Sequence, residues 1–235
     1  MKAIPTLEQP NKSRDIEPID SYFVELTDNK IFDVCLKYHQ KKCENATDRC
    51  LVRKEVYEKL KIANKNLPKG IHLKIWDAWR PFLLQEELYN DYSEFLVEKY
   101  NLDEKTKKER EFIISKFISP PVKNKLCPPV HTTGGAVDVT LVDDYGKELD
   151  MGTEFDEFSE CTETSFFENS DNEIIRDNRR ILYNAMIKAG FTNLPSEWWH
   201  YDYGDRFWAY YKNKPAIYEG IFKIGEIKTG ETKEK

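Results

Sequence analysis

The sequence predicts a single domain of the α+β class. Apolar or alternating segments that are typical of strands recur along its 235 residues, at 22–26, 71–76 and 136–142. Helical spacing of apolar residues marks other parts of the chain, at about 52–67, 82–96 and 172–188. The chain contains no internal repeat and no dividing linker, and its length suits one large domain. The expected organisation is an extended arm over 1–18, a folded domain over 19–224 and a frayed tail over 225–235.

The first part of the chain is predicted to alternate between strand and helix. The arm is polar and rich in proline, the segment 22–26 is a strand, and an irregular loop continues through Asp48. The helix at 52–67 ends at Pro68-Lys69-Gly70, because such residues interrupt helices. In the strand that follows, apolar residues alternate with polar ones, which places His72 on the polar face without a chemical role.

The sequence Asp77-Ala78-Trp79-Arg80-Pro81 lies where this strand gives way to a helix. Pro81 suits the first turn of that helix, since its missing N–H is not needed there. Arg80 therefore lies at a corner of the chain, where functional side chains are often displayed. Two interpretations are open at this point: Arg80 acts in a site, or it pairs with Asp77 to hold the corner. A charged helical stretch follows at about 105–117.

The last third of the chain contains a long irregular segment and a long helix. The segment 149–170 lacks regular periodicity, and we expect it to form one wall of a pocket, since long loops are often functional. The helix at 172–188 is expected to turn Ile174 inward and to end at Gly190, which suits a helix cap. Residues 206–211 are rich in aromatic side chains and are predicted to form a strand.

The most informative stretch is His131-Thr132-Thr133-Gly134-Gly135-Ala136-Val137-Asp138. Side chains alternate along a strand, so residues an odd number apart point to opposite faces. His131 and Asp138 converge only if the chain bends between them, and Gly134-Gly135 permits that bend. A carboxylate inside an apolar strand is costly unless it is paired or bound to a metal. The alternative is a hairpin with a hydrogen-bonded Asp138 and a surface His131.

A second histidine and a second carboxylate occur together at Glu197-Trp198-Trp199-His200. With His131 and Asp138 they supply the groups of a catalytic zinc site, which has three protein ligands, an open position for water and a carboxylate to take the proton from that water. The helical metalloprotease motif is absent, so such a site must be assembled from two separate segments of the chain.

Composition and charge argue against several classes of partner. The net charge is -6 with no basic block before the tail, so nucleic acid is not an expected partner. No run of 18 apolar residues occurs, so we expect no membrane span. The first five residues lack the apolar core of a secretory signal, which predicts a cytoplasmic location, or a periplasmic or secreted one if a leader has been trimmed. The sequence does not define an oligomeric state.

The five cysteines are odd in number and form no CxxC pair. This pattern argues against a disulfide framework and against a cysteine-rich zinc site. Cys35, Cys43 and Cys50 are close enough in sequence to hold one bridge in an exported protein, and free thiols are the interpretation that we favour.

These motifs resemble those of the D-alanyl-D-alanine dipeptidases of peptidase family M15, the family of the vancomycin-resistance dipeptidase. The resemblance extends from about Tyr22 to Tyr211 and rests on blocks in a fixed order: Asp77-Ala78-Trp79-Arg80-Pro81, His131 to Leu141, Leu149-Asp150-Met151-Gly152-Thr153, Phe155-Asp156 and Glu197-Trp198-Trp199-His200. These zinc peptidases are related in fold to D,D-carboxypeptidases and to the hedgehog signalling domain. The resemblance therefore implies a central, mostly antiparallel sheet with flanking helices.

The resemblance also implies roles for individual residues. His131, Asp138 and His200 would bind one zinc ion per chain, Glu197 would be the general base, and Arg80 would stabilise the transition state. The implied substrate is a small D,D-dipeptide, D-Ala-D-Ala, which is hydrolysed to two D-alanines within a catalytic domain over 19–224.

One position departs from the family pattern. Members commonly have a serine close to the substrate, two positions before the first zinc histidine, where this chain has Pro129. Proline offers neither a hydroxyl nor an N–H. Two alternatives are therefore kept: a D,D-carboxypeptidase that acts on peptidoglycan stem peptides, and a non-catalytic, zinc-stabilised binding domain. Glu197 and Arg80 argue against the second, because a purely structural zinc site needs neither.

Overall fold

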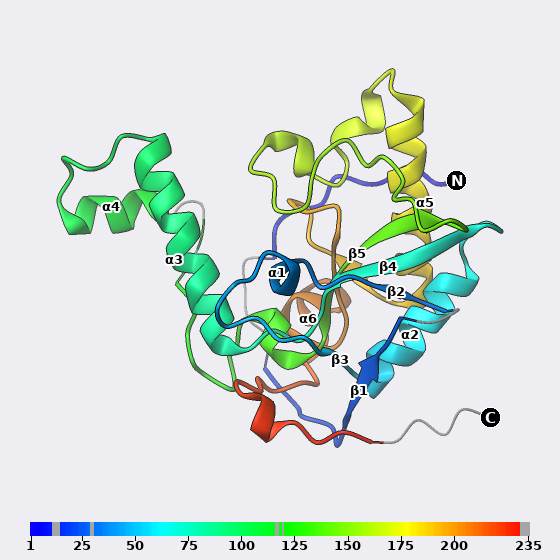
Figure 1. Ribbon diagram of the computed structural model, residues 1–235, viewed down its shortest axis with the longest axis horizontal. Coiled ribbons are helices and arrows are strands. Elements are labelled where there is room, and N and C mark those ends of the chain that lie inside the picture. Colours follow the sequence, from blue (N-terminus) through cyan, green and yellow to red (C-terminus); the bar gives the residue numbers. More distant parts are fainter. Residues whose placement is uncertain (11–14, 29–30, 116–117, 119, 231–235) are drawn as a thin grey trace.

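A computed structural model describes residues 1–10, 15–28, 31–115, 118 and 120–230. At its centre lies a five-stranded sheet in the order β2-β4-β5-β7-β6 (Figure 1), whose strands are β2 (Asp33–Val34), β4 (Ile71–Asp77), β5 (Ala136–Asp143), β7 (His200–Asp202) and β6 (Thr192–Asn193). The pairing of β2 with β4 is parallel and the other pairings are antiparallel. The predicted α+β fold with a mostly antiparallel sheet is confirmed.

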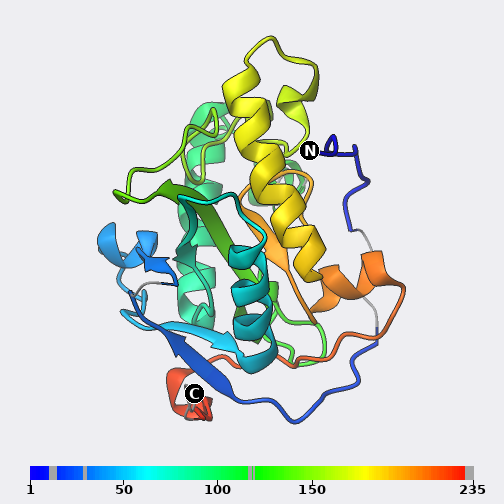
Figure 2. The ribbon, with the colours of Figure 1, turned by 90° about the vertical axis from the view of Figure 1, so that its right-hand side faces the viewer.

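Helices flank the sheet on both faces (Figure 2). α2 (Lys54–Lys65) and α5 (Glu173–Ala189) pack against each other on one face, where their apolar residues join the core. α1 (Lys37–Gln40) and α3 (Phe82–Lys99) lie on the other side of the sheet, and α4 (Lys107–Ile114) extends with the end of α3 away from the body of the molecule (Figure 1).

A second, two-stranded antiparallel sheet pairs β1 (Phe23–Leu26) with β3 (Cys50–Arg53). The helix predicted at 52–67 therefore begins only at Lys54, because Val52 belongs to β3 and pairs with Val24. The predicted irregular loop through Asp48 is likewise wrong in part, since it contains β2 and α1. In both places a pairing with a distant segment determines the local structure, and local periodicity does not report such pairings.

The predicted strand at 206–211 is wrong, because these residues form the helix α6 (Arg206–Lys212). The Asp205 side chain caps the helix by accepting hydrogen bonds from the backbone N–H groups of Phe207 and Trp208. At the other end Asn213 adopts a left-handed conformation, with φ 52°, that terminates the helix. The caps thus outweigh the β-propensity of the aromatic side chains.

The long helix α5 ends as predicted, at Gly190 with φ 106°. The prediction that Ile174 points inward is wrong, because Ile174 is exposed, whereas the adjacent Ile175 is buried. The two termini are packed on the domain over the residues that the structure describes. Glu17 N–H donates to Ala216 O in the arm, and Gly230 N–H donates to Phe23 O, so the tail is ordered as far as Gly230. Residues 231–235 of the predicted tail lie outside the described residues.

No helix within the described ranges is both long and apolar enough to cross a membrane.

The bend predicted between His131 and Asp138 is present. A 3-10 turn, η1 (Val130–Thr133), ends at Gly134, whose φ of 73° is left-handed, and β5 begins two residues later. A Cβ atom at Gly134 would lie 2.3 Å from Cε1 of the buried Phe23. Glycine is therefore required here both by the backbone conformation and by the contact with β1.

We predict that Gly134→Ala lowers the free energy of unfolding by about 2–4 kcal/mol, from left-handed strain together with overpacking against Phe23. Gly146→Ala is the matched control, because Gly146 also has a positive φ, 77°, but its added Cβ would meet only Asp33 Oδ2 at 3.9 Å. The control should lose only about 1 kcal/mol of strain. Urea unfolding of both variants measures the difference, and equal losses would contradict the packing argument.

Candidate active site

The strand register brings three functional side chains into one row across the sheet. In the antiparallel pairing of β5 with β7, Asp138 lies opposite His200. In the pairing of β4 with β5, Asp77 lies opposite Asp138, after an irregularity in register between Ile75 and Asp77. Directly opposite residues point to the same face of a sheet. Asp77, Asp138 and His200 therefore share the face on which α1 and α3 lie.

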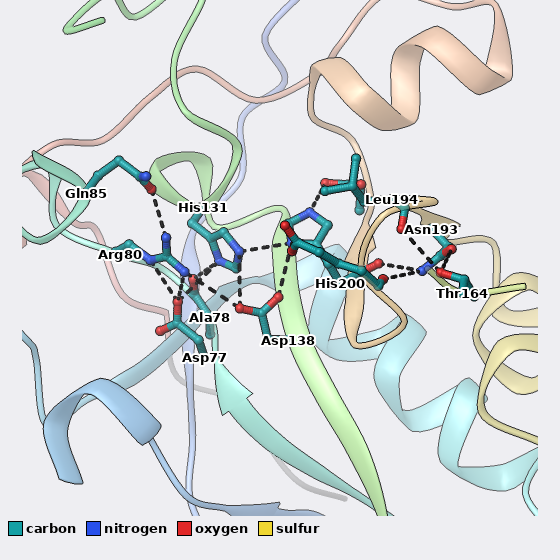
Figure 3. A network of polar contacts seen from close by, with 12 residues as sticks. Asp77, Ala78, Arg80, Gln85, His131, Asp138, Thr164, Asn193, Leu194 and His200 are labelled. Carbon is teal, nitrogen blue, oxygen red and sulfur yellow. Dashed lines mark hydrogen bonds and ion pairs between the residues drawn. The ribbon is translucent and has the colours of Figure 1, made fainter. Parts of the chain in front are cut away.

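His131 reaches the same row from η1, across the bend at Gly134 (Figure 3). Its Nε2 lies 3.2 Å from Nδ1 of His200 and 3.5 Å from Oδ2 of Asp138. His200 Nδ1 in turn lies 3.1 Å from Oδ1 of Asp138. The structure thus brings together the three predicted metal ligands, all of them buried.

Each of the two histidines has an outer ring nitrogen, which points away from the cluster, and an inner one, which points into it. Both outer nitrogens already have a hydrogen-bond partner. His131 Nδ1 lies 2.8 Å from the Ala78 carbonyl oxygen, and His200 Nε2 lies 2.9 Å from Oδ1 of Asp202. Because both partners are acceptors, these nitrogens carry the protons, and in neutral imidazoles the lone pairs lie on the inner nitrogens. Those inner nitrogens and an Asp138 oxygen all lie within 4.8 Å of one another. The residues therefore fit a metal ion bound by two nitrogens and one oxygen.

The electrostatics of the cluster favour a bound cation. Burial would raise the pKa of Asp138, but His131 and His200 hold it well below its usual range. Burial would lower the pKa of His200, but Asp202 and Asp138 raise it well above its usual value. The cluster thus stabilises positive charge at its centre. A divalent cation that displaced a proton from the cluster would supply such a charge as well.

Arg80 lies at the β4–α3 corner, where its predicted pairing with Asp77 is confirmed, and its action in a site stays a prediction. Its Nε and Nη2 donate to Oδ2 of Asp77, at 2.9 and 2.7 Å, and its Nη1 donates to Oε1 of Gln85 at 2.9 Å. Nη2 also lies 3.7 Å from Oδ2 of Asp138. The ion pair that holds the corner therefore also fixes a guanidinium beside the candidate metal-binding cluster (Figure 3).

Glu197 lies at the edge of the cluster, in the turn that precedes β7. Its Oε2 is 3.9 Å from Nδ1 of His200, and its side chain keeps 39% of its exposure. Desolvation by the surrounding protein, together with the negative charges of Asp138 and Asp156, raises the pKa of Glu197 to about 7. A carboxylate with this pKa can both accept and release a proton near neutral pH.

The segment 149–170, predicted as a pocket wall, is held against the turn that leads into β7, the strand that carries His200. Trp198 donates from its backbone N to Thr162 O and from its indole Nε1 to Thr153 Oγ1. The buried Arg179 on α5 holds the same segment by donating to the carbonyl oxygens of Met151, Cys161 and Glu163. The pocket itself stays a prediction.

Three residues near the cluster were missed as site residues by the sequence analysis: Tyr38, Asp156 and Asp202. Asp202 follows His200 by two positions in β7, and this spacing on a strand was a signal that both share one face. Asp156 belongs to a block that carried the family resemblance. Tyr38 lies on α1, within the segment predicted to be irregular, and offered no signal of its own.

His72 and the clustered cysteines agree with their interpretations. His72 Nε2 pairs with Oδ1 of Asp144 at 2.8 Å on the surface, away from the cluster. Cys35, Cys43 and Cys50 are free thiols in the structure.

Comparison with known proteins identifies the family. A family model described as D-ala-D-ala dipeptidase matches residues 34–217, a range that includes β2, β4, β5 and β7 and every residue of the cluster. The chain belongs to the D-Ala-D-Ala dipeptidase family. It is thus a hydrolytic peptidase by descent, and the resemblance inferred from the motifs is confirmed.

Individual relatives agree with this assignment. A D-alanyl-D-alanine dipeptidase of Synechocystis sp. is 34% identical over 168 residues, which cover 65% of this chain and 68% of the relative. The Escherichia coli K12 enzyme of the same name is 28% identical over 66% of this chain and 67% of its own. That of Enterococcus faecium is 30% identical over 57% of this chain and 62% of its own.

We predict that Asp202→Ala weakens the binding of Zn²⁺ by about 10–100-fold, because His200 loses the acceptor that fixes its tautomer and ring orientation. Asp144→Ala is the matched control, since Asp144 also accepts from a histidine but lies on the surface. Competition with a chromophoric chelator measures both affinities. An unchanged affinity in Asp202→Ala would contradict the assignment of His200 Nδ1 as a ligand atom.

Proposed function

We propose that this protein is a zinc-dependent D-alanyl-D-alanine dipeptidase that hydrolyses D-Ala-D-Ala to two D-alanines, with residues 19–224 as its catalytic domain. The observation that carries the proposal is the convergence of His131, Asp138 and His200, with Arg80 and Glu197 on either side. The names of the relatives supply the substrate class.

The proposed ligands of the zinc ion are His131 Nε2, His200 Nδ1 and an oxygen of Asp138. Two nitrogens and one oxygen are a donor set that suits zinc, and a catalytic site leaves a further position open. When bound, zinc polarises the scissile carbonyl and lowers the pKa of water from ~15.7 to roughly 7. The two histidines are held for this task by Ala78 and Asp202, which leave the inner nitrogens free of protons.

Glu197 is the proposed general base. Its carboxylate lies beside His200 yet remains partly exposed, so an attacking water can lie between Glu197 and the substrate carbonyl. The carboxylate accepts the proton of that water and then donates it to the nitrogen of the departing D-alanine as the C–N bond breaks. The raised pKa of Glu197 suits this second step, because it lets the protonated carboxyl persist until the amine departs.

Arg80 is the proposed donor to the oxyanion that forms on the carbonyl. Its guanidinium is already held by Asp77 and Gln85, so it needs no rearrangement when the negative charge develops. A single fixed donor of this kind contributes on the order of 3–4 kcal/mol to stabilisation of a transition state.

Asp156 is the proposed partner of the substrate's ammonium group. The charge of its carboxylate acts on Glu197, and its Oδ2 lies 3.7 Å from Nζ of the largely exposed Lys41. Burial and the charge of Asp138 raise the pKa of Asp156 to about 6, which shows that negative charge crowds this end of the site. A free dipeptide carries a positive charge at its amino end, and an ammonium beside Asp156 would relieve that crowding.

Pro129 does not replace the contact that a serine would make with the substrate, but it has a structural role here. Its carbonyl oxygen accepts from the backbone N and from Oγ1 of Thr132, and it thereby begins the turn that delivers His131. Any donor to the substrate's carboxylate must come from another residue, so the substrate range is best determined directly.

The proposed function is tested by incubating zinc-loaded protein with D-Ala-D-Ala, with L-Ala-L-Ala and with a longer peptide that ends in D-Ala-D-Ala, and by measuring released alanine. We expect release from D-Ala-D-Ala alone. Release from the longer peptide would instead favour a D,D-carboxypeptidase. Binding of zinc without any hydrolysis would favour a non-catalytic binding domain and contradict the proposal.

We predict that substitution of the proposed general base and substitution of a proposed zinc ligand affect zinc binding and turnover differently. Glu197→Ala should keep one zinc ion per chain and lose at least about 10²-fold in kcat, because only the proton acceptor is removed. His131→Ala should lose both zinc and turnover. Glu154→Ala, at an exposed glutamate of the segment 149–170, is the control and should change neither. Metal analysis beside initial rates gives both readouts, and normal turnover by Glu197→Ala would show that the base is wrongly assigned.

A further inference from the structure

Three aromatic side chains form a stack that joins α3 to the segment 149–170. Tyr92 and Phe95 belong to α3, and Phe158 belongs to the segment. The ring centres of Tyr92 and Phe158 lie 4.1 Å apart with an angle of 15° between the ring planes, and the ring centre of Phe95 lies 5.1 Å from that of Phe158. The stack is thus a direct contact between two parts of the chain that are distant in sequence.

The stack lies at the surface and outside the hydrophobic core. Phe158 is 47% exposed and Phe95 is 38% exposed, and none of the three rings belongs to the core. Exposed apolar groups that gather in one place mark a site of interaction more often than single exposed groups do. The proposed mechanism does not use these rings, so their position needs a separate reason.

The helix α3 carries the stack at one position and supports Arg80 at another. Gln85 accepts from Nη1 of Arg80 at 2.9 Å. Tyr92 follows Gln85 by seven residues, about two helical turns, which places both side chains on one side of the helix. At a rise of 1.5 Å per residue, the stack lies about 10 Å along α3 from the residue that holds Arg80. The helix thus leads from the proposed oxyanion donor to the stack.

The segment 149–170 connects the stack to the other side of the site. The ring centre of Phe155 lies 5.6 Å from that of Trp199, the neighbour of His200. From there the segment passes through Asp156, the proposed partner of the substrate's ammonium group, and reaches α3 at Phe158. The stack therefore lies beyond the amino end of a dipeptide bound as proposed.

The electrostatics of Tyr92 agree with this placement. Burial raises the pKa of Tyr92, and its interactions with Tyr100 and with the carboxylate of Glu197 act in the same direction. The side chain of Glu197 keeps 39% of its exposure, so the proposed general base is accessible. The stack thus lies on the side of the site from which the general base is influenced by its surroundings on α3.

We propose that the stack of Tyr92, Phe95 and Phe158 is the wall that limits the substrate to a dipeptide, because it blocks the residues that precede D-Ala-D-Ala in a longer peptide. The inference rests on the proposed function and adds the residues that determine its specificity. An extended chain spans about 3.5 Å per residue, so roughly three residues on the amino side of the scissile bond would cover the ~10 Å to the stack. D-Ala-D-Ala has one such residue and ends short of the stack, whereas a pentapeptide has four and would meet it.

The test compares kcat/KM of the zinc-loaded protein for a pentapeptide that ends in D-Ala-D-Ala with kcat/KM for D-Ala-D-Ala. Phe158→Ala should raise the ratio of the first value to the second at least about tenfold, because it removes the ring that joins the segment to α3. Tyr92→Ala should raise the ratio as well, whereas Tyr92→Phe keeps the ring and should not. Phe166→Ala is the matched control, since Phe166 lies in the same segment and is 44% exposed, but its ring packs on the adjacent Phe167.

A second readout does not require turnover. Calorimetry gives the dissociation constant of the pentapeptide for zinc-loaded Glu197→Ala protein, with and without Phe158→Ala, and the added substitution should strengthen binding at least about tenfold. An unchanged ratio in Phe158→Ala, unchanged binding of the pentapeptide, or an equal rise of the ratio in Phe166→Ala would overturn the inference. These results are distinct from failure of the proposed function, in which the wild-type protein would not hydrolyse D-Ala-D-Ala at all.

Discussion

The register between β5 and β7 is the constraint on which the rest of the site depends. It places His200 directly opposite Asp138, and it leaves Tyr201 on the other face, in the core between the sheet and α5. A shift of one residue would exchange these two faces, burying an imidazole among apolar side chains and removing it from the cluster. The pairing of β6 with the same strand, which places Thr192 opposite Asp202, stabilises this register from the outer side.

The buried charges at the site are tolerated because each has a partner of suitable chemistry. Asp77 accepts two bonds from Arg80, His131 donates to the Ala78 carbonyl, and Asp202 accepts from His200. Removal of one member of such a set leaves another charge buried and unpaired, which is more costly than the pair is favourable. These hydrogen bonds hold the cluster in place, so in the proposed reaction its donors and ligands would need little rearrangement.

The parts of the fold that were predictable from sequence are those determined by local chemistry. The glycine bend before β5, the alternation within β4 and the cap of α5 at Gly190 each depend on neighbours in the chain. The strand β3 was missed because its partner β1 is distant in sequence. The helix α6 was missed for another reason, since its cap at Asp205 is local and the aromatic side chains that follow favour a strand by propensity. The same distinction holds at the site. The candidate metal ligands have characteristic motifs, whereas Tyr38 reaches Arg80 only through the tertiary arrangement of α1.

The central claim is that two imidazoles and one carboxylate from separate strands bind a single zinc ion. X-ray absorption at the zinc edge of the loaded protein tests it most directly. The account predicts nitrogen and oxygen neighbours at about 2.0–2.1 Å, with the multiple scattering of two imidazoles and no sulfur. A sulfur shell near 2.3 Å, or a spectrum that stays the same after His131→Ala, would contradict the account.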